Sequence, residues 1–285
     1  MKDLENNRIE DYPSISQSEV CPYIPGLNPF PALCFTDDEV NWQTHKAPYT
    51  DLANQSRYST YSDGNDGYFF YKTVEALSSE PISDPVGSYF GKLLDLPVIP
   101  TGLMVSTNHT GRHILGVVSQ VVSWTGLAAD DDVPDEKILN RMNKSALVGD
   151  GILRAWMRDH DHRWSHVMIV TGSDSTQYYY IIDHGRAFED AQSRWNEKAL
   201  LDSGVGECLW ETQCAFEVAM GYVRKIQKIP DWEIATKPIE IALSIQKYNI
   251  PQKQWYLRRA YEMSSFLIKS KRTLEHDIKN WFGRT

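Results

Sequence analysis

The chain has 285 residues, with 38 Asp or Glu against 29 Lys or Arg, and therefore a formal net charge of −9. This length allows one large domain or two small ones that share a continuous core. The acidic balance argues against a general nucleic-acid binder, because such proteins need a basic surface to neutralise phosphates.

Cysteine usage and hydropathy predict a cytoplasmic protein. The four cysteines have no Cys-x-x-Cys spacing, so neither a zinc ribbon nor a disulfide framework is indicated. No apolar run reaches the roughly 18 residues of a membrane span, and the N-terminal MKDLENNRIEDYP has no hydrophobic signal region. We therefore expect no membrane span and no secretory signal.

The first 60 residues are rich in Pro, Asn and Ser, and they predict only two strands, near residues 40–42 and 58–61. Residues 54–57 form a loop that contains no glycine. The loop lies one strand before the predicted strand that contains Lys72.

A strand is predicted over residues 68–74, where alternation places Tyr68, Phe70, Lys72 and Val74 on one face. A lysine among aromatic side chains on an inward face needs an anion as its partner. The alternative is that Lys72 extends its ammonium group to solvent at the edge of the sheet. Further along, the apolar run 113–124 predicts a central strand that leads to a linker.

The segment 152–188 predicts a β-hairpin with an acidic cluster at each end. A helical stretch leads into the charged loop DHDHRWSH, residues 159–166, and then into a strand at 167–170. After a turn rich in Gly, Ser and Asp, a second strand at 178–182 ends in Asp183, His184 and Gly185. This strand-loop-strand order is typical of a kinase catalytic loop and its metal-binding Asp.

The remainder of the chain predicts helices over 207–227, 233–247 and 251–278, separated by Pro230 and Pro251. Their apolar positions indicate a core on which the hairpin rests. We assign them no chemistry.

Across residues 55–190 the sequence resembles the HipA-like kinases, especially short bacterial members with a phosphoinositide-kinase-like catalytic core. The loop and the Ile-Asp-His-Gly end of the hairpin carry most of the resemblance. It implies that Asp161 is the catalytic Asp, with Arg163 beside the family's Arg position, and that Asp183 is a metal ligand. The family's metal-binding Asn is replaced here by His166.

The resemblance also implies an ATP site. Lys72 would contact the nucleotide, with Asp84 on the following helix as its acidic partner and Glu80 and Glu75 as alternatives. Phosphate contacts would come from the backbone N–H groups of Gln55 and Ser56 or from the guanidinium of Arg57. The adenine would meet backbone groups near Val121.

The implied fold is α+β and two-lobed, like a protein kinase, with a β-rich N-lobe in residues 1–125 and a helical C-lobe in 126–285. The implied activity is ATP-dependent phosphoryl transfer, most readily to Ser or Thr of a protein, with magnesium as the metal. Imidazole is softer than an amide oxygen, so His166 favours manganese, unless Asp159 supplies an oxygen instead.

Three alternatives remain open at this level. The replaced loop residues and the missing glycine loop also suit a pseudokinase or nucleotide-binding module. The histidines of residues 159–166 suit a metal-dependent hydrolase, although their order departs from the usual cluster. The same Asp and His residues could also form only a solvated ion network that caps the hairpin.

Overall fold

The computed structural model describes the following parts of the chain: residues 35–36, 43–45, 58–62, 68–74, 77–107, 113–120, 126–127, 144–159, 161–162, 166–171, 177–181, 183–188 and 213–283. Ser56, Arg57, Val121 and Arg163, together with the strand predicted at 40–42, lie outside these residues. Their predicted roles therefore stay predictions.

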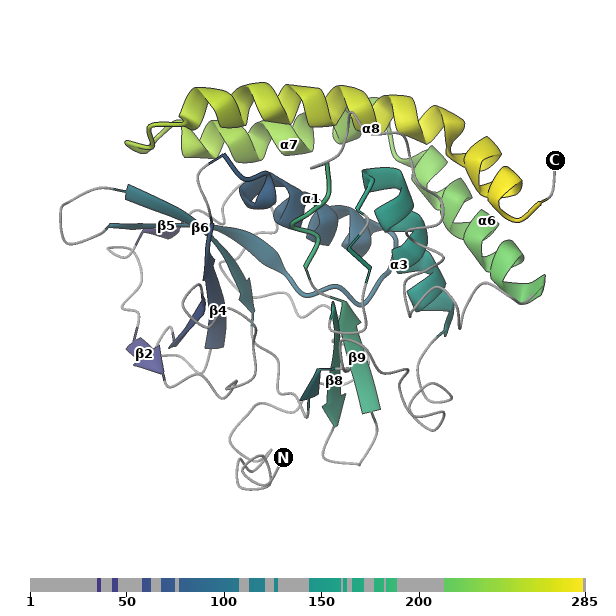
Figure 1. The fold of residues 1–285 in the computed structure, drawn as a ribbon, viewed down its shortest axis with the longest axis horizontal. Coiled ribbons are helices and arrows are strands. Elements are labelled where there is room, and N and C mark those ends of the chain that lie inside the picture. The colour runs from purple at the N-terminus through teal and green to yellow at the C-terminus, as the bar shows by residue number, and fades with distance from the viewer. Residues whose placement is uncertain are drawn as a thin grey trace.

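A six-stranded sheet forms one part of the fold (Figure 1). Its strands, in the order β1-β5-β6-β4-β3-β2, are antiparallel neighbours except for the parallel pair β1 and β5. The predicted central strand is confirmed as far as the described residues extend, because β6 lies between β5 and β4. The bounds are β1 Phe35–Thr36, β2 Gln43–His45, β3 Tyr58–Ser62, β4 Tyr68–Thr73, β5 Thr101–Thr107 and β6 His113–Gln120.

A second, three-stranded sheet contains the predicted hairpin. It has the order β7-β8-β9, with β7 Gly126–Leu127, β8 Val167–Thr171 and β9 Gln177–Ile181. The hairpin pairs Val167 with Ile181 and Thr171 with Gln177, so the first residue of β8 lies beside the last residue of β9. This register brings the loop before β8 next to the loop after β9.

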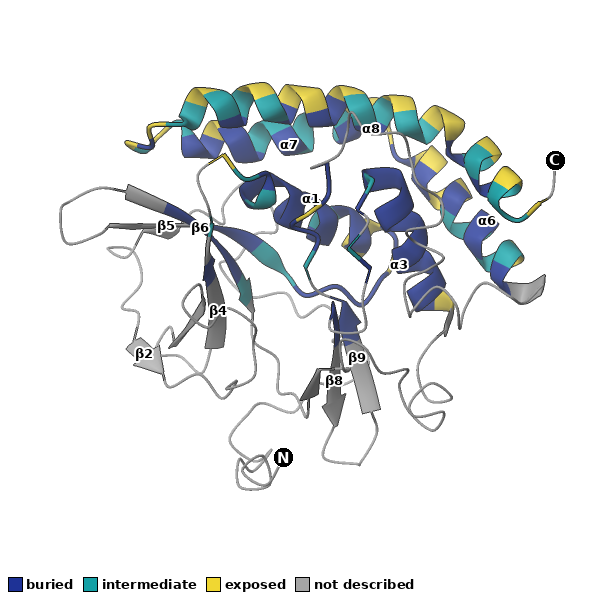
Figure 2. Ribbon diagram, in the orientation of Figure 1, coloured by how far each residue is buried: buried dark blue, intermediate teal, exposed yellow. Residues whose placement is uncertain are grey.

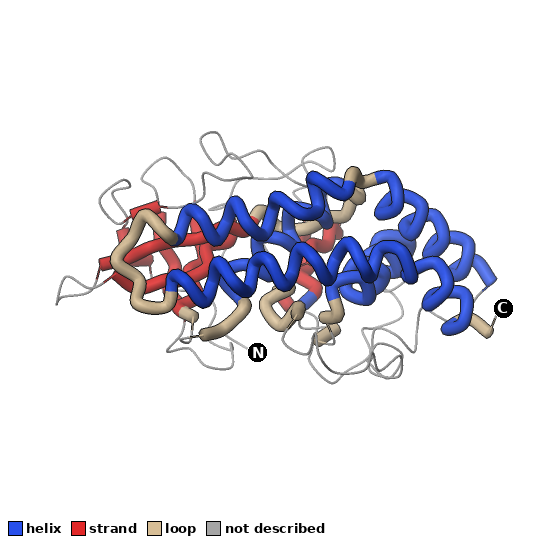
Figure 3. The backbone as a smooth tube through the Cα atoms, turned by 90° about the horizontal axis from the view of Figure 1, so that it is seen from above, coloured by secondary structure: helices blue, strands red, loops and turns tan. Residues whose placement is uncertain are grey.

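The helices are α1 Glu80–Leu93, α3 Lys144–Met157, α6 Gln213–Lys228, α7 Asp231–Ile245 and α8 Lys253–Trp281. The three predicted C-terminal helices are confirmed, with ends shifted by a few residues where the structure describes them. Pro230 is the N-cap of α7 and has extended backbone angles. A proline cannot continue the preceding helix, so α6 ends before it and α7 begins after it. Seen from above, α7 and α8 run side by side along the molecule (Figure 3).

Helix α1 lies between the large sheet and the other helices, because it contacts β5 and β6 on one side and α3 and α7 on the other. Most of its length is buried, as is most of α3 (Figure 2). Phe90 of α1 packs edge-on against Trp156 of α3, with ring centroids 5.0 Å apart. The Trp156 indole N–H in turn donates to the Leu267 carbonyl of α8 at 2.9 Å. Both helices are therefore held in the core.

The segment after α1 is tied to the end of the hairpin. Val98 forms a parallel bridge with Ile181, in which the Ile181 N–H donates to the Pro97 carbonyl at 2.8 Å and the Ile99 N–H donates to the Ile181 carbonyl at 3.1 Å. This bridge joins the end of β9 to the segment that follows α1.

Together these helices and antiparallel sheets confirm the predicted α+β class. Within the described residues, no helix is both long and apolar enough to cross a membrane.

Candidate functional site

Lys72 projects from β4 into a buried cluster of carboxylates. Its side chain is 8% exposed, and its Nζ lies 3.3 Å from Asp84 Oδ2 and 3.3 Å from Asp183 Oδ1. Glu80 Oε1 is slightly farther, at 3.7 Å. The alternative in which Lys72 reaches solvent at the sheet edge is wrong, because β4 is flanked by β6 and β3 and the ammonium group is enclosed.

Asp84 joins two elements with its two oxygens. Oδ2 faces Lys72, and Oδ1 accepts the backbone N–H of His184 at 2.6 Å. Burial raises the pKa of Asp84 to about 6, with repulsion from Asp183 and Glu80 acting in the same direction and Lys72 acting against them. Of the other two acids proposed for Lys72, Glu80 lies within the cluster, and Glu75 is outside the described residues.

Asp183 follows β9 in a left-handed backbone conformation, with φ of +58°. Its Oδ1 accepts the N–H of Gly185 at 3.1 Å in addition to facing Lys72. Burial favours its neutral form, but Lys72, His166 and the Gly185 N–H outweigh burial and lower its pKa below the ordinary value. Its side chain is still 33% exposed, so an ionised carboxylate faces the outside of the cluster.

Small and hydroxyl side chains on α1 let the His184–Gly185 loop approach closely. The Ser83 hydroxyl donates to the Gly185 carbonyl at 2.7 Å. A Cβ placed on Gly87 would lie 2.5 Å from the His184 Cβ, so a side chain at Gly87 would push the loop away. The sequence between Glu80 and Leu93 is therefore matched to the hairpin end, and not only to the core.

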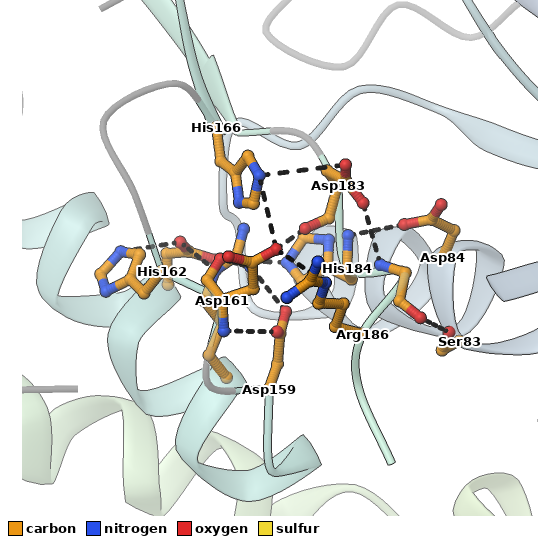
Figure 4. Close-up of polar contacts among 12 residues, drawn as sticks. Ser83, Asp84, Asp159, Asp161, His162, His166, Asp183, His184 and Arg186 are labelled. Carbon is orange, nitrogen blue, oxygen red and sulfur yellow. Dashed lines mark hydrogen bonds and ion pairs between the residues drawn. The ribbon is translucent and has the colours of Figure 1, made fainter. Parts of the chain in front are cut away.

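Asp161 and His166 lie across from Asp183 (Figure 4). His166 Nε2 is 4.0 Å from Asp161 Oδ2 and 3.9 Å from Asp183 Oδ2, so the imidazole lies between the two carboxylates. Asp161 Oδ2 is also 3.3 Å from Nε of Arg186, whose side chain is exposed. The hairpin register thus brings together the predicted catalytic and metal-binding residues.

The His166 imidazole is buried, and its Nδ1 has no hydrogen-bond partner among the residues that the structure describes. Burial and the nearby Arg154 lower the pKa of His166 below 6.5, against the opposing pull of Asp183 and Asp161. The neutral ring therefore predominates at neutral pH, with a nitrogen available toward the two carboxylates.

Sequence reasoning missed Arg154, which is fully buried beneath both loops. Its Nε donates to Asp150 Oδ2 at 2.8 Å, and its Nη1 lies 2.5 Å from Asp159 Oδ2. The signal was available: Arg154 stands in an otherwise apolar helical turn, ILRAWM, with Asp150 four residues earlier on the same helix face.

The Arg154 network corrects two expectations: that Asp159 supplies a metal ligand, and that the loop histidines gather around one metal. Asp159 is fully buried, with Oδ2 toward Arg154 and Oδ1 accepting the Asp161 N–H at 3.0 Å, so it does not replace His166 as a metal ligand. His162 turns to the buried Asp150, with its Nε2 3.2 Å from Asp150 Oδ2. His162 and His166 therefore face different carboxylates.

This divergence removes the support for a hydrolase-type metal cluster from the described part of the loop. Within the described residues, no group of three or more His, Cys, Asp or Glu side chains has the geometry to hold a metal ion. His160 lies outside those residues.

Chemically, the cluster offers a buried cation, an ionised and partly exposed carboxylate, and a second carboxylate across an imidazole. The purely structural reading, a solvated ion network, does not fit, because Lys72, Asp84 and Asp159 are buried. Asp183 is the most exposed carboxylate of the cluster, so it is the group that a ligand from outside can reach most readily.

Comparison with models of protein families finds no match, and comparison with curated protein sequences finds none. Among solved structures, a Helicobacter pylori proinflammatory kinase, CtkA, aligns over 86% of this chain and 99% of its own, with 10% identity and a TM-score of 0.49. A Leishmania major MAP kinase, LmaMPK10, aligns over 86% of this chain and 84% of its own, with 13% identity and a TM-score of 0.32. Both scores are low, so neither protein's activity is carried over to this chain.

Proposed function

We propose that this protein is an ATP-dependent phosphotransferase of the kinase type. The observation that carries the proposal is that Asp84 and Asp183 each place a carboxylate oxygen 3.3 Å from the ammonium group of Lys72. These residues come from a strand, the following helix and the end of a distant hairpin. Phosphoryl transfer needs this combination of phosphate-binding cation and cation-binding carboxylate.

The proposed roles follow the positions of the groups. Lys72 binds the nucleotide phosphates, and Asp84 orients Lys72. Asp161 is separated from Asp183 by the His166 imidazole, so it is a second carboxylate that is distinct from the proposed metal ligand. We assign it the role of accepting the proton of the acceptor hydroxyl.

Magnesium fits Asp183 by donor chemistry. Hard divalent cations prefer carboxylate oxygens, and the lowered pKa keeps Asp183 ionised. The ion, when bound, would neutralise charge on the phosphates. The His166 nitrogen is a softer donor that favours manganese over magnesium.

The finer features of the proposal rest on the sequence resemblance. We propose a two-lobed, HipA-like arrangement, with the boundary near residue 125, and a Ser or Thr of a protein as acceptor. All six strands of the large sheet precede that boundary, and the second sheet with α3, α6, α7 and α8 follows it. Ser56, Arg57, Val121 and Arg163 remain the predicted contacts for phosphate, adenine and acceptor.

A second candidate function is a nucleotide-binding module that transfers no phosphate. One observation favours it: Arg186 already forms an ion pair with Asp161, at 3.3 Å, which is the carboxylate proposed to receive the acceptor proton. For transfer to occur, this exposed arginine would have to release Asp161.

Incubation with labelled ATP, first with magnesium and then with manganese, tests the proposal. We expect label on the protein, located by mass spectrometry, and none with Asp183→Asn. The asparagine variant suits this purpose because Asn tolerates the left-handed backbone at this position. ATP binding without transfer, in either metal, would favour the nucleotide-binding module.

A further inference from the structure

Arg154 connects the two functional loops through their main chains. Besides its carboxylate partners, its Nη1 donates to the Asp161 carbonyl at 3.2 Å and to the Asp183 carbonyl at 3.0 Å. A single nitrogen atom therefore contacts the backbone of both residues. Movement of either loop would break one of these contacts.

The anchor of this connection is rigid. Arg154 has no exposed surface, and it projects from α3, whose neighbouring residues Leu153 and Trp156 are also fully buried. Asp150 holds the guanidinium from below through Nε, and Asp159 holds it from the side. Because the planar guanidinium is bonded at both Nε and Nη1, it cannot rotate without losing one of its two carboxylate partners.

The same network extends to the residues next to Asp161 and Asp183. Asp159 Oδ1 accepts the Asp161 N–H at 3.0 Å, and Asp150 Oδ1 forms a hydrogen bond with Nε2 of His184 at 3.2 Å. Nε2 of His162 lies 3.2 Å from Asp150 Oδ2 but forms no hydrogen bond with the described residues. The network therefore holds the first loop at Asp161 and the second loop at Asp183 and His184. In the view of Figure 4, Asp159 lies below Asp161, and His184 lies below Asp183.

Asp183 also has a left-handed backbone conformation, with φ of +58°. Aspartate adopts this conformation more readily than most residues other than glycine, and the contacts to its carbonyl and from the Gly185 N–H to its side chain hold it there.

We propose that Arg154 is a positioning residue that sets the separation of Asp161 from Asp183, and so the alignment of the acceptor with the transferred phosphate. It touches neither substrate. The inference rests on the proposed function for its kinetic consequence, but the positioning itself is a property of the protein alone.

The test uses Arg154→Lys, which keeps the buried charge but replaces the fork of donors with a single ammonium. The matched control is Leu153→Ala, a neighbouring buried change with no part in the network. Arg154→Met is a third variant that removes the charge. Each variant is first compared by its melting temperature, and all assays run below the lowest value.

Two readouts are measured on the full chain. Amide hydrogen exchange follows residues 159–162 and 183–188 without ATP, and steady-state kinetics separates kcat from the KM for ATP. We expect Arg154→Lys to exchange faster in both segments and to lose about 10²-fold in kcat, the usual scale for misplaced reacting groups. Its KM should change little, and Leu153→Ala should leave both segments protected and kcat nearly unchanged.

The outcomes distinguish this inference from the proposed function. Suppose that the wild-type protein transfers no phosphate but both segments of Arg154→Lys exchange faster than those of the wild type. This result would support the positioning role of Arg154 and would rule out the proposed kinase activity. Exchange and kcat equal to those of Leu153→Ala would overturn positioning while leaving a kinase. Loosening of one segment alone would also overturn it, because the proposal requires that Arg154 hold both. If Arg154→Met does not fold, the lysine variant decides.

Discussion

Asp84 connects Lys72 to the backbone of His184: one carboxylate oxygen lies 3.3 Å from the ammonium group and the other accepts the His184 N–H at 2.6 Å. Helix α1 is thereby joined both to the large sheet and to the end of the hairpin. The Ser83 hydroxyl and the close contact at Gly87 act on the same loop. Packing of α1 against the hairpin therefore fixes the position of the carboxylate cluster.

The Asp84 link predicts different effects of two substitutions. Asp84→Ala should lower the free energy of unfolding by roughly 2 kcal/mol, because the buried His184 N–H loses a charged acceptor. Asp84→Asn should cost less, since an amide oxygen can still accept that hydrogen bond. Urea denaturation measures both.

Asp95→Asn is the control for the Asp84 variants. It removes an exposed carboxylate near the end of α1, which pairs with Lys225, and Asn tolerates the positive φ at this position. A change of less than about 1 kcal/mol is expected. Equal losses for Asp84→Ala and Asp95→Asn would show that the His184 contact contributes little.

Asp161→Asn should separate transfer from binding. Asparagine keeps the shape but cannot accept the acceptor proton, so kcat should fall by roughly 10² to 10⁴, the scale for a positioned general base. The affinity for ATP, measured by calorimetric titration, should stay the same. A parallel loss of affinity would mean that Asp161 contributes to nucleotide binding instead.

His166 predicts an unusual metal preference. If its nitrogen ligates the cation beside Asp183, manganese should support higher activity than magnesium, and His166→Asn should restore the preference for magnesium. The lowered pKa keeps the ring neutral at pH 7, so activity should decline only below pH 6.5, as the imidazole takes up a proton.

The pH profile of His166→Asn supplies the comparison. Its acid limb should be flatter than that of the wild type, because asparagine does not titrate. Identical metal preference and pH dependence in the two proteins would place His166 outside the metal site.

Asp150 predicts a loss of stability in acid. Burial favours its neutral form, but Arg154, with His162 and His184, lowers its pKa well below 3.8. A depressed carboxylate pKa stabilises the fold above the unfolded-state value, and this stability is lost as pH falls toward the folded-state value. The free energy of unfolding should therefore decrease steeply below about pH 4.

Asp150→Asn should cost about 3–5 kcal/mol at pH 7, the usual loss when one partner of a buried ion pair is removed. The difference from wild type should then shrink as the pH falls below 4, because the Asp150 carboxyl of the unfolded wild-type chain binds a proton there while the folded one stays ionised. Chemical denaturation at several pH values measures this convergence. A difference that is constant with pH would contradict the electrostatic origin of the effect.

The sequence alone determined the local elements. Alternation and turn composition located the hairpin nearly to the residue, because side-chain period and turn chemistry act over a few neighbouring positions. The same argument located the strand of Lys72 and the three C-terminal helices. The acidic clusters at the two ends of the hairpin were visible in the sequence, and the family resemblance singled out Asp161 and Asp183 within them.

The sequence resemblance predicted that Lys72 pairs with Asp84, but only the tertiary structure decided that Asp84 also binds the His184 backbone and that Arg154 lies beneath both loops. The Val98–Ile181 bridge and the burial of α1 bring Asp84 to both Lys72 and the His184 loop, and residues so far apart in sequence leave no local pattern of their contact. Likewise, the apolar turn around Arg154 indicates that this arginine is buried, but it does not indicate which backbone carbonyls the guanidinium meets. Whether a charged side chain is enclosed depends on which elements pack over it. In this fold, Asp159 turns inward to Arg154, and His162 turns inward to Asp150. His166 instead faces Asp161 and Asp183.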